Sequence, residues 1–377
     1  MVIETEIIKE QCAKIAQAVN KDNDAEHSNY NITEVLEIYS YDRVLYINVT
    51  NKEYYVRVKI NIDSDELIHA TVNADLFLKL ITQITTPDVE LYTKAQTLVV
   101  KANGMYKLPL IFDGDKLLEL PEIQINNVTC EMDIPCETLR GILRYNSKEL
   151  RKKTVAQPVQ RMYYVDNEGA ITFTSSACVN SFKLDKPIRM LLNSKIVKLF
   201  KLFEDEFVSF KLGYDALADG IIQTKVSFIA RDVELSAILS CDDTLLNSVP
   251  VSSIRGMADK IYPYSVTIFK DELIQAINRL TLFNKEKDDE AIFEFSSNKL
   301  TIRNVDDGGC EEISYAGTPL NISSPISTML SFTDVKLSTE SFTDQCIILN
   351  FGGPEEKAII ITKDNIKNVI PRIVFGR

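Results

Sequence analysis

Two short stretches of the chain carry positive side chains at spacings that would place them together on one side of a helix. Residues three or four positions apart share a helix face, and this spacing relates Arg140, Arg144, Lys148 and Arg151 in the first stretch and Lys195, Lys198 and Lys201 in the second. Apolar residues lie between them, which predicts that another face of each helix is buried. Such a row of cations can bind the phosphates of a nucleic acid without reading its bases. An ordinary solvated charged face has the same pattern, so the spacing leaves both interpretations open.

No motif in the sequence indicates catalysis or a bound cofactor. The phosphate-binding pattern G-x-x-x-x-G-K-[ST] does not occur. The two histidines, His27 and His69, stand far apart without a framework of cysteines or acids, which disfavours a metal site. A tight hairpin turn explains the acidic, glycine-rich stretch 306–309 better than a cation-binding loop does. We therefore expect a protein that is not an enzyme and that has no catalytic residue, no metal and no cofactor.

A helix-and-strand pattern occurs three times along the chain. Longer amphipathic helices are predicted at 6–20, 136–152 and 270–285, and second helices at 73–84, 194–203 and, ambiguously, within 325–342. The period of about 120–135 residues is too long for a solenoid and corresponds to one domain per repeat. We expect domains at 1–125, 126–252 and 253–377. The segments between the helices alternate apolar and polar residues, which predicts antiparallel sheets with one buried face. In helix 73–84 we expect Leu76, Leu80 and Ile84 to face inward.

The overall charge argues against nucleic-acid binding unless the cations are segregated on one surface. The 377 residues include 42 Lys and Arg against 54 Asp and Glu, a formal net charge of −12, whereas nucleic-acid-binding domains are usually basic. The first and third repeats add few candidates, namely Lys9, Lys14, Lys79, Arg279 and Lys285. Seven scattered cysteines without a C-x-x-C pair indicate reduced thiols, and no apolar run is long enough to span a membrane. With an acidic N-terminus unlike a signal peptide, these features favour a cytoplasmic protein.

Three further stretches have a recognisable pattern. They are ATVNADLF at 70–77, continuing through 110; FKDELIQAINRL at 269–280; and IILNFGGP at 347–354, continuing through VIPRIV at 369–374. Together they resemble parts of the first and third domains of the bacterial-type DNA sliding clamp, the β subunit of the DNA polymerase III holoenzyme. The resemblance covers nearly the whole chain, and a divergent, phage-encoded member of that family would have such a sequence.

The resemblance implies an α+β fold of three tandem clamp domains, with antiparallel sheets outside and two helices per domain lining a ring. Two copies would pair head to tail as a homodimer, and double-stranded DNA of any sequence would pass through the ring. Short peptide motifs of the DNA polymerase and the clamp loader would bind, so that the chain acts as a processivity factor; no membrane is implied. The alternative is an intracellular protein-binding scaffold of the same fold that does not encircle DNA.

The resemblance also implies two protein interfaces. Leu282 and Phe283 of one copy would pack near Tyr106 and Leu108 of the other, although core packing at a helix end is the alternative for the first two. The pocket for partner peptides would be formed by Cys178, Asn180, Pro250, Val369, Ile370 and Pro371. The stretch TSSACVN at 174–180 departs from the ATDGHRL-like strand usual in the family. This departure predicts a partner motif that differs from the usual one.

Overall fold

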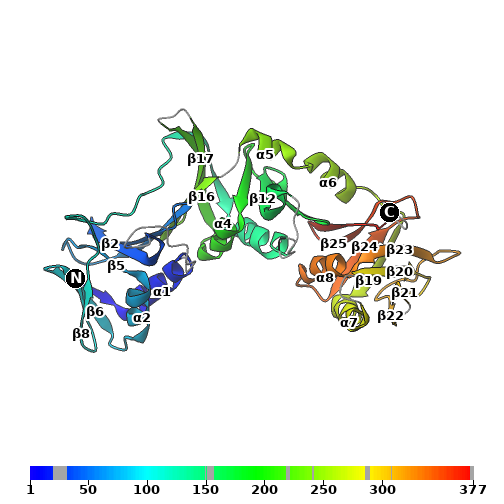
Figure 1. Ribbon diagram of the computed structural model, residues 1–377, viewed down its shortest axis with the longest axis horizontal. Coiled ribbons are helices and arrows are strands. Elements are labelled where there is room, and N and C mark those ends of the chain that lie inside the picture. The colour runs from blue at the N-terminus through cyan, green and yellow to red at the C-terminus, as the bar shows by residue number, and fades with distance from the viewer. Residues whose placement is uncertain are drawn as a thin grey trace. The chain divides into compact units, whose positions relative to one another are not determined.

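The computed structural model describes residues 1–19, 32–148, 150, 157–217, 221–239, 242–284, 289–306 and 308–373 (Figure 1). These residues form two compact units. Unit one comprises Met1–Cys136 and Lys198–Ser240, and unit two comprises Glu137–Val197 and Cys241–Arg377. The division between the units therefore runs through the middle repeat, while every sheet lies within one unit.

Unit one contains a four-stranded and an eight-stranded antiparallel sheet among its described residues. The four-stranded sheet has the order β1 (Val2–Glu4), β6 (Asp88–Lys94), β7 (Thr97–Lys101), β8 (Met105–Pro109). The eight-stranded sheet has the order β11 (Asn127–Pro135), β16 (Phe207–Ala216), β17 (Ile222–Ile229), β18 (Val233–Leu239), β4 (Tyr54–Asn61), β3 (Val44–Thr50), β2 (Val35–Tyr41), β5 (His69–Asn73). A small hairpin of β9 (Phe112–Asp113) and β10 (Lys116–Leu117) follows the four-stranded sheet in the sequence.

Unit two has a matching pair of antiparallel sheets in its described part. The eight-stranded sheet has the order β15 (Arg189–Asn193), β12 (Met162–Asp166), β13 (Gly169–Phe173), β14 (Ala177–Ser181), β26 (Ile366–Pro371), β25 (Ala358–Lys363), β24 (Cys346–Phe351), β19 (Tyr264–Phe269). The four-stranded sheet has the order β22 (Cys310–Ser314), β21 (Lys299–Asn304), β20 (Glu290–Phe295), β23 (Ile326–Ser331).

The strand orders confirm the threefold repeat. Each repeat supplies a first group of four strands, in the orders β5-β2-β3-β4, β15-β12-β13-β14 and β23-β20-β21-β22. Each also supplies a second group, in the orders β1-β6-β7-β8, β11-β16-β17-β18 and β19-β24-β25-β26. An eight-stranded sheet arises where the last strand of a first group pairs with the last strand of the next repeat's second group, as β4 does with β18 and β14 with β26. The chain is thus an α+β protein built from three copies of one topology.

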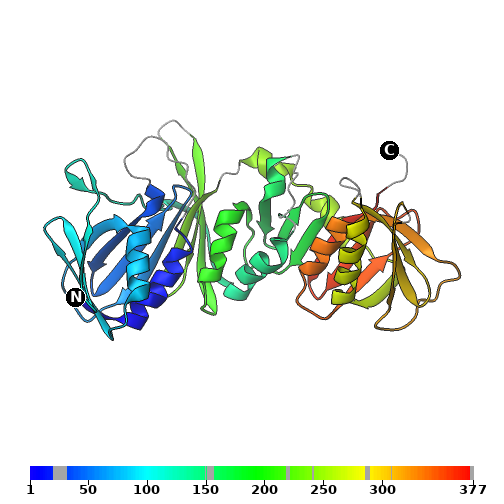
Figure 2. The ribbon, with the colours of Figure 1, turned by 60° about the horizontal axis from the view of Figure 1, so that its bottom comes forward.

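Pairs of helices cover one face of the sheets in the first and third repeats (Figure 2). In unit one, α1 (Thr5–Ala16) and α2 (Ala74–Gln83) lie side by side, and in unit two α7 (Lys270–Leu280) and α8 (Phe332–Glu340) do the same. The α1 helix buries Ile8, Cys12 and Ile15, as their spacing predicts. The described helices include none that is both long and apolar enough to cross a bilayer.

The inward face of α2 differs from the prediction. The Asn73 side chain caps this helix by accepting a hydrogen bond from the Leu76 amide, so the helix begins at Ala74. From that start, positions i, i+3, i+4 and i+7 form the buried stripe, and they hold Ala74, Phe77, Leu78 and Ile81. Leu76 is exposed and Leu80 is half-buried, and only Ile84, just beyond the helix, is buried as expected.

The helices of the middle repeat are shorter and less regular than predicted. They are α3 (Cys136–Gly141), followed by a π-helical turn at Ile142–Asn146, and α4 (Ser194–Lys198), followed by a 3₁₀ turn at Leu199–Leu202. Two helices missed by the sequence analysis, α5 (Asp243–Ser248) and α6 (Val251–Ala258), fill the connection to the third repeat. Further 3₁₀ turns lie at Ile32–Glu34, Pro158–Arg161 and Thr281–Phe283.

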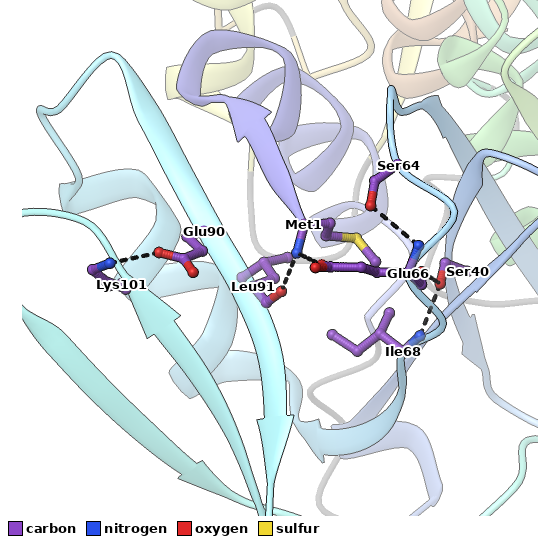
Figure 3. A network of polar contacts seen from close by, with 8 residues as sticks. All are labelled: Met1, Ser40, Ser64, Glu66, Ile68, Glu90, Leu91 and Lys101. Carbon is purple, nitrogen blue, oxygen red and sulfur yellow. Dashed lines mark hydrogen bonds and ion pairs between the residues drawn. The ribbon is translucent and has the colours of Figure 1, made fainter.

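A network of polar contacts fastens the first strand to unit one (Figure 3). The amino group of Met1 donates to the carbonyl oxygen of Leu91 at 2.9 Å and also to the carboxylate of Glu66. The Ser40 hydroxyl donates to the Glu66 carbonyl oxygen and accepts from the Ile68 amide, each at 2.8 Å. These contacts hold β1 beside β6 and the loop before β5 beside β2.

Candidate nucleic-acid and partner interfaces

The second cationic stretch forms an exposed row on a short helical segment. The apolar residues of α4 and the following 3₁₀ turn are buried, whereas the exposed residues include Lys195, Lys198 and Lys201. A 3₁₀ turn has three residues, so Lys198 and Lys201 lie one turn apart on the same side. Neither Lys198 nor Lys201 has a carboxylate at ion-pair distance among the described residues. These two side chains can therefore meet an external anion.

The first cationic stretch is less available than predicted. The carboxylate of Glu137 lies 3.3 Å from Arg140 and 3.7 Å from Arg144, so the two arginines share one acid. The predicted helix 136–152 is wrong in form, because its α-helical part ends at Gly141 and a wider π turn follows. The wider turn changes which side chains share a face, so the four cations are not aligned as the α-helical spacing predicts. Lys148 lies half-buried in the turn that follows the π-helical residues. Arg151 lies outside the described residues.

The candidate cations of the first and third repeats are held by acids. Lys79 lies 2.6 Å from Asp75, and Arg279 binds both carboxylate oxygens of Glu311 at 2.6 and 2.8 Å. Lys9 lies 3.5 Å from Glu6, and Lys285 is outside the described residues. These three candidate cations are therefore paired with acids, whereas Lys198 and Lys201 have no such pairing within the described part of the chain.

Lys14 is buried, contrary to a role in binding DNA. Its ammonium group donates to Asp232 at 2.7 Å and to Glu10 at 3.0 Å, and it lies 3.7 Å from Glu204. Burial alone would raise the pKa of Asp232, but hydrogen bonds from Lys14 and Gln11 hold that pKa below its ordinary value of 3.8. Lys14 thus ties α1 of the first repeat to the turn before β18 of the second.

Two sheet edges carry the residues predicted at a dimer interface. β8 ends the four-stranded sheet of unit one, and β22 ends that of unit two. On β8, Tyr106 is 39% exposed but Leu108 only 2%, so the Leu108 side chain belongs to the core of its own chain. Leu282 and Phe283 are 80% and 62% exposed, which excludes core packing within the described chain. Phe283 lies beside Gly308 and Gly309, next to the start of β22.

The residues predicted to form a peptide pocket lie on opposite faces of one sheet. Successive side chains of a strand point to opposite faces. Cys178 and Ile370 are fully buried in the core that contains α7, and Asn180 is also buried, its side chain accepting from Asn365 at 3.4 Å. These three residues cannot line a surface pocket in this structure, and the prediction for them is wrong.

The other face of the same sheet is covered by α5 and α6. Val369 packs there with Val249, Ile254 and Ala258 and is buried. Pro371 ends β26 opposite Ala358 and is half-buried. Pro250 lines a hollow of about 400 Å³ between the start of α6 and strands β12 and β15. The hollow is also lined by Tyr164, Asp166, Arg189 and Arg255. No pattern in the sequence brings these four residues together.

Comparison with solved structures gives the fold a name. The structures of the Pseudomonas aeruginosa sliding clamp (DNA polymerase III subunit beta) bound to griselimycin and of the Bacillus subtilis DNA polymerase sliding clamp both match. Their TM-scores are 0.80 and 0.76 at 13% and 15% sequence identity, and each match covers 100% of this chain and 99% of the other. This chain has the fold of bacterial DNA sliding clamps. The Helicobacter pylori beta clamp bound to a DNA ligase peptide also matches, with a TM-score of 0.74 at 15% identity over 100% of both chains. No protein-family model and no curated protein matches the sequence.

Proposed function

We propose that this chain is the protomer of a DNA sliding clamp, a ring-shaped processivity factor that encircles duplex DNA and tethers a replicative polymerase. The observation that carries the proposal is the pair of sheet edges left without a partner strand. Inside the chain, β4 pairs with β18 and β14 with β26. The strands in the corresponding positions are β22 of the third repeat and β8 of the first, and both end their sheets.

A second copy of the chain supplies the missing partner for each of these edges. β22 of one copy would pair with β8 of the other, and the same junction would form again at the opposite ends of the two chains. Such head-to-tail contacts close when the rotation completes a ring, and they remove the exposed strand edges. The six domains of the homodimer would be three per chain, at 1–125, 126–252 and 253–377.

DNA contact in this proposal is electrostatic and independent of sequence. Lys195, Lys198 and Lys201, with Arg140, Arg144, Lys148 and Arg151, are the candidate phosphate contacts. The remaining surface is strongly acidic overall, since the net charge is −12, and it would repel DNA. Retention would come from encirclement, so each contact can stay weak enough to permit sliding.

Partner proteins would dock through short peptides in the hollow at Pro250. The DNA polymerase and the clamp loader are the expected partners, and the protein would act in the cytoplasm. The clamp would not be an enzyme; it would raise the local concentration of its polymerase at the primer end.

Primer extension on a primed single-stranded circle tests this function. With the cognate polymerase and loader, adding the chain should lengthen the product made in one binding event, in the presence of excess trap DNA. Product lengths that do not change when the chain is added would contradict the proposal.

A further inference from the structure

The hollow at Pro250 is lined by both apolar and cationic residues. Val249, Pro250 and Val251 are among its apolar lining residues, and Arg189 is among its cationic ones. Its volume of about 400 Å³ lies within the range of sites that hold small ligands or a few side chains. The lining therefore suits an occupant that combines an aliphatic group with an acceptor of opposite charge.

Arg189 keeps a positive charge that the chain itself does not neutralise. It is the exposed first residue of β15. Its Nη2 donates to the carbonyl oxygen of Leu246 at 3.2 Å and to Oδ1 of Asn247 at 3.0 Å, both neutral acceptors. In the part of the chain that the structure describes, no carboxylate lies at ion-pair distance from Arg189. These contacts orient the guanidinium group from α5 without compensating its charge.

The nearest acid is already committed to a different arginine. Asp166 is the cross-strand neighbour of Arg189, but its two carboxylate oxygens accept from Arg255 at 2.7 and 2.9 Å. Arg255 also binds Glu168 at 2.8 Å. Burial alone would lower the pKa of Arg255, yet the hydrogen bonds to Asp166 raise it overall. Asp166 and Glu168 therefore satisfy Arg255 and leave Arg189 as the cation of the hollow.

We propose that Arg189 determines the specificity of this hollow by binding the side-chain carboxylate of an Asp or Glu that lies beside an aliphatic anchor in the partner's peptide. The planar guanidinium group matches a carboxylate with two parallel hydrogen bonds, which neutral acceptors cannot equal in strength. The apolar lining residues Val249 and Pro250 would contact the aliphatic side chain. This inference rests on the proposed function, because it requires that the hollow receives partner peptides.

Three peptides that differ at one position test the assignment. Each is a capped acetyl-Ser-Leu-X-Leu-Ser-amide peptide with Asp, Asn or Lys at X, so no terminal carboxylate is present. By titration calorimetry at low salt, the wild-type protein should bind the Asp peptide at least about five-fold more tightly than the Asn peptide. Equal affinities for the two peptides, or no binding of either, would overturn the proposal.

Variants at Arg189 separate recognition from a general change of charge. In Arg189→Gln the preference for Asp over Asn should vanish, and in Arg189→Glu the Lys peptide should become the preferred one. Lys183→Gln is the matched control, since Lys183 is exposed in the segment before β15 and its loss changes the net charge by the same amount. An Asp preference that survives Arg189→Gln, or that is lost equally in Lys183→Gln, would refute the assignment.

Retention on circular DNA, measured on the same wild-type preparation, tests the clamp proposal separately from the role of Arg189. Protein that is retained but binds the Asp and Asn peptides equally refutes the role of Arg189 and leaves the clamp proposal standing. Protein that is not retained but shows the Arg189-dependent preference refutes the clamp proposal and supports the peptide site.

Discussion

At the scale of single residues, Lys198 and Lys201 are the best-supported phosphate contacts. Replacing either with Gln should weaken DNA binding equally for unrelated sequences and should reduce the slope of log affinity against log salt by about one. Fluorescence anisotropy at several salt concentrations measures both effects. Lys79→Gln is the control, because Lys79 already lies 2.6 Å from Asp75 and its loss should change the slope little. A slope that responds to Lys79 as strongly as to Lys198 would contradict the assignment.

Lys14 gives a prediction for stability rather than for DNA binding. Lys14→Met should lower the free energy of unfolding at pH 7 by about 1 kcal/mol or more, because Asp232 loses its charged partner. The folded-state pKa of Asp232 lies below its ordinary value of 3.8, so the pair stabilises the fold fully above that pH. The stabilisation is lost as the pH falls through the lower, folded-state pKa.

Denaturant unfolding of the wild type and of Lys14→Met, measured from pH 7 down to pH 3, checks this sign. The difference between the two proteins should begin to narrow as the pH approaches 3.8, the ordinary pKa of the Asp232 carboxyl, and should narrow further below it. A difference that stays constant down to pH 3, or that is absent at pH 7, would show that the Lys14–Asp232 contact does not stabilise the junction of the first two repeats.

At the scale of elements, the exposed edges of β8 and β22 predict a dimer. Changing both Leu282 and Phe283 to Asp should give folded monomers, because burying two such side chains contributes roughly 1.5–3 kcal/mol each. Light scattering with circular dichroism measures mass and folding together. Leu76→Asp is the control, since Leu76 is likewise an exposed leucine, on α2. An unchanged dimer mass in the double variant would rule out this interface.

The start of a helix was predictable where a strong periodic apolar stripe marked it. In α7 the predicted start at Lys270 is correct, and its stripe of Leu273, Ala276 and Ile277 is buried. In the segment 325–342, Ser331 weakened the helical prediction, yet its side chain caps α8 by accepting from the Asp334 amide at 2.9 Å. The Asp242 side chain caps α5 in the same way, accepting from the Leu245 amide at 2.7 Å. Ser331 and Asp242 thus begin helices that the apolar pattern alone does not predict clearly.

The site was less predictable than the fold, because it depends on which face of a strand each residue occupies. Cys178 and Val369 were assigned to one pocket. Cys178 pairs with Asn368, so these two side chains point to the same face of the sheet. Val369 is the next residue along the strand, so its side chain points to the opposite face. Arg189 belongs to no motif or periodic pattern that would mark it as a binding residue in the sequence. Its importance follows only from the ion pair between Asp166 and Arg255, which links residues 89 positions apart in the sequence.

At the scale of the whole molecule, the proposed function uses the exposed lysines for DNA contact and the sheet edges for assembly. The net charge of −12 means that simple affinity for DNA cannot hold the protein in place, whereas a few exposed lysines can track phosphates at close range. In the proposed clamp, the sheet edges at β8 and β22 would let a second copy complete a closed assembly. An acidic scaffold that binds only proteins would need neither the lysine row nor the closure.

Retention on circular DNA is the measurement that tests encirclement most directly. The chain is loaded onto a nicked circular plasmid by the cognate loader, separated from free protein by gel filtration, and then treated with an enzyme that cuts the plasmid once. The protein should elute with the circle, leave after linearisation, and remain if bulky proteins block both ends of the linear DNA. Protein that stays on the linear DNA with open ends, or that never elutes with the circle, would contradict the account.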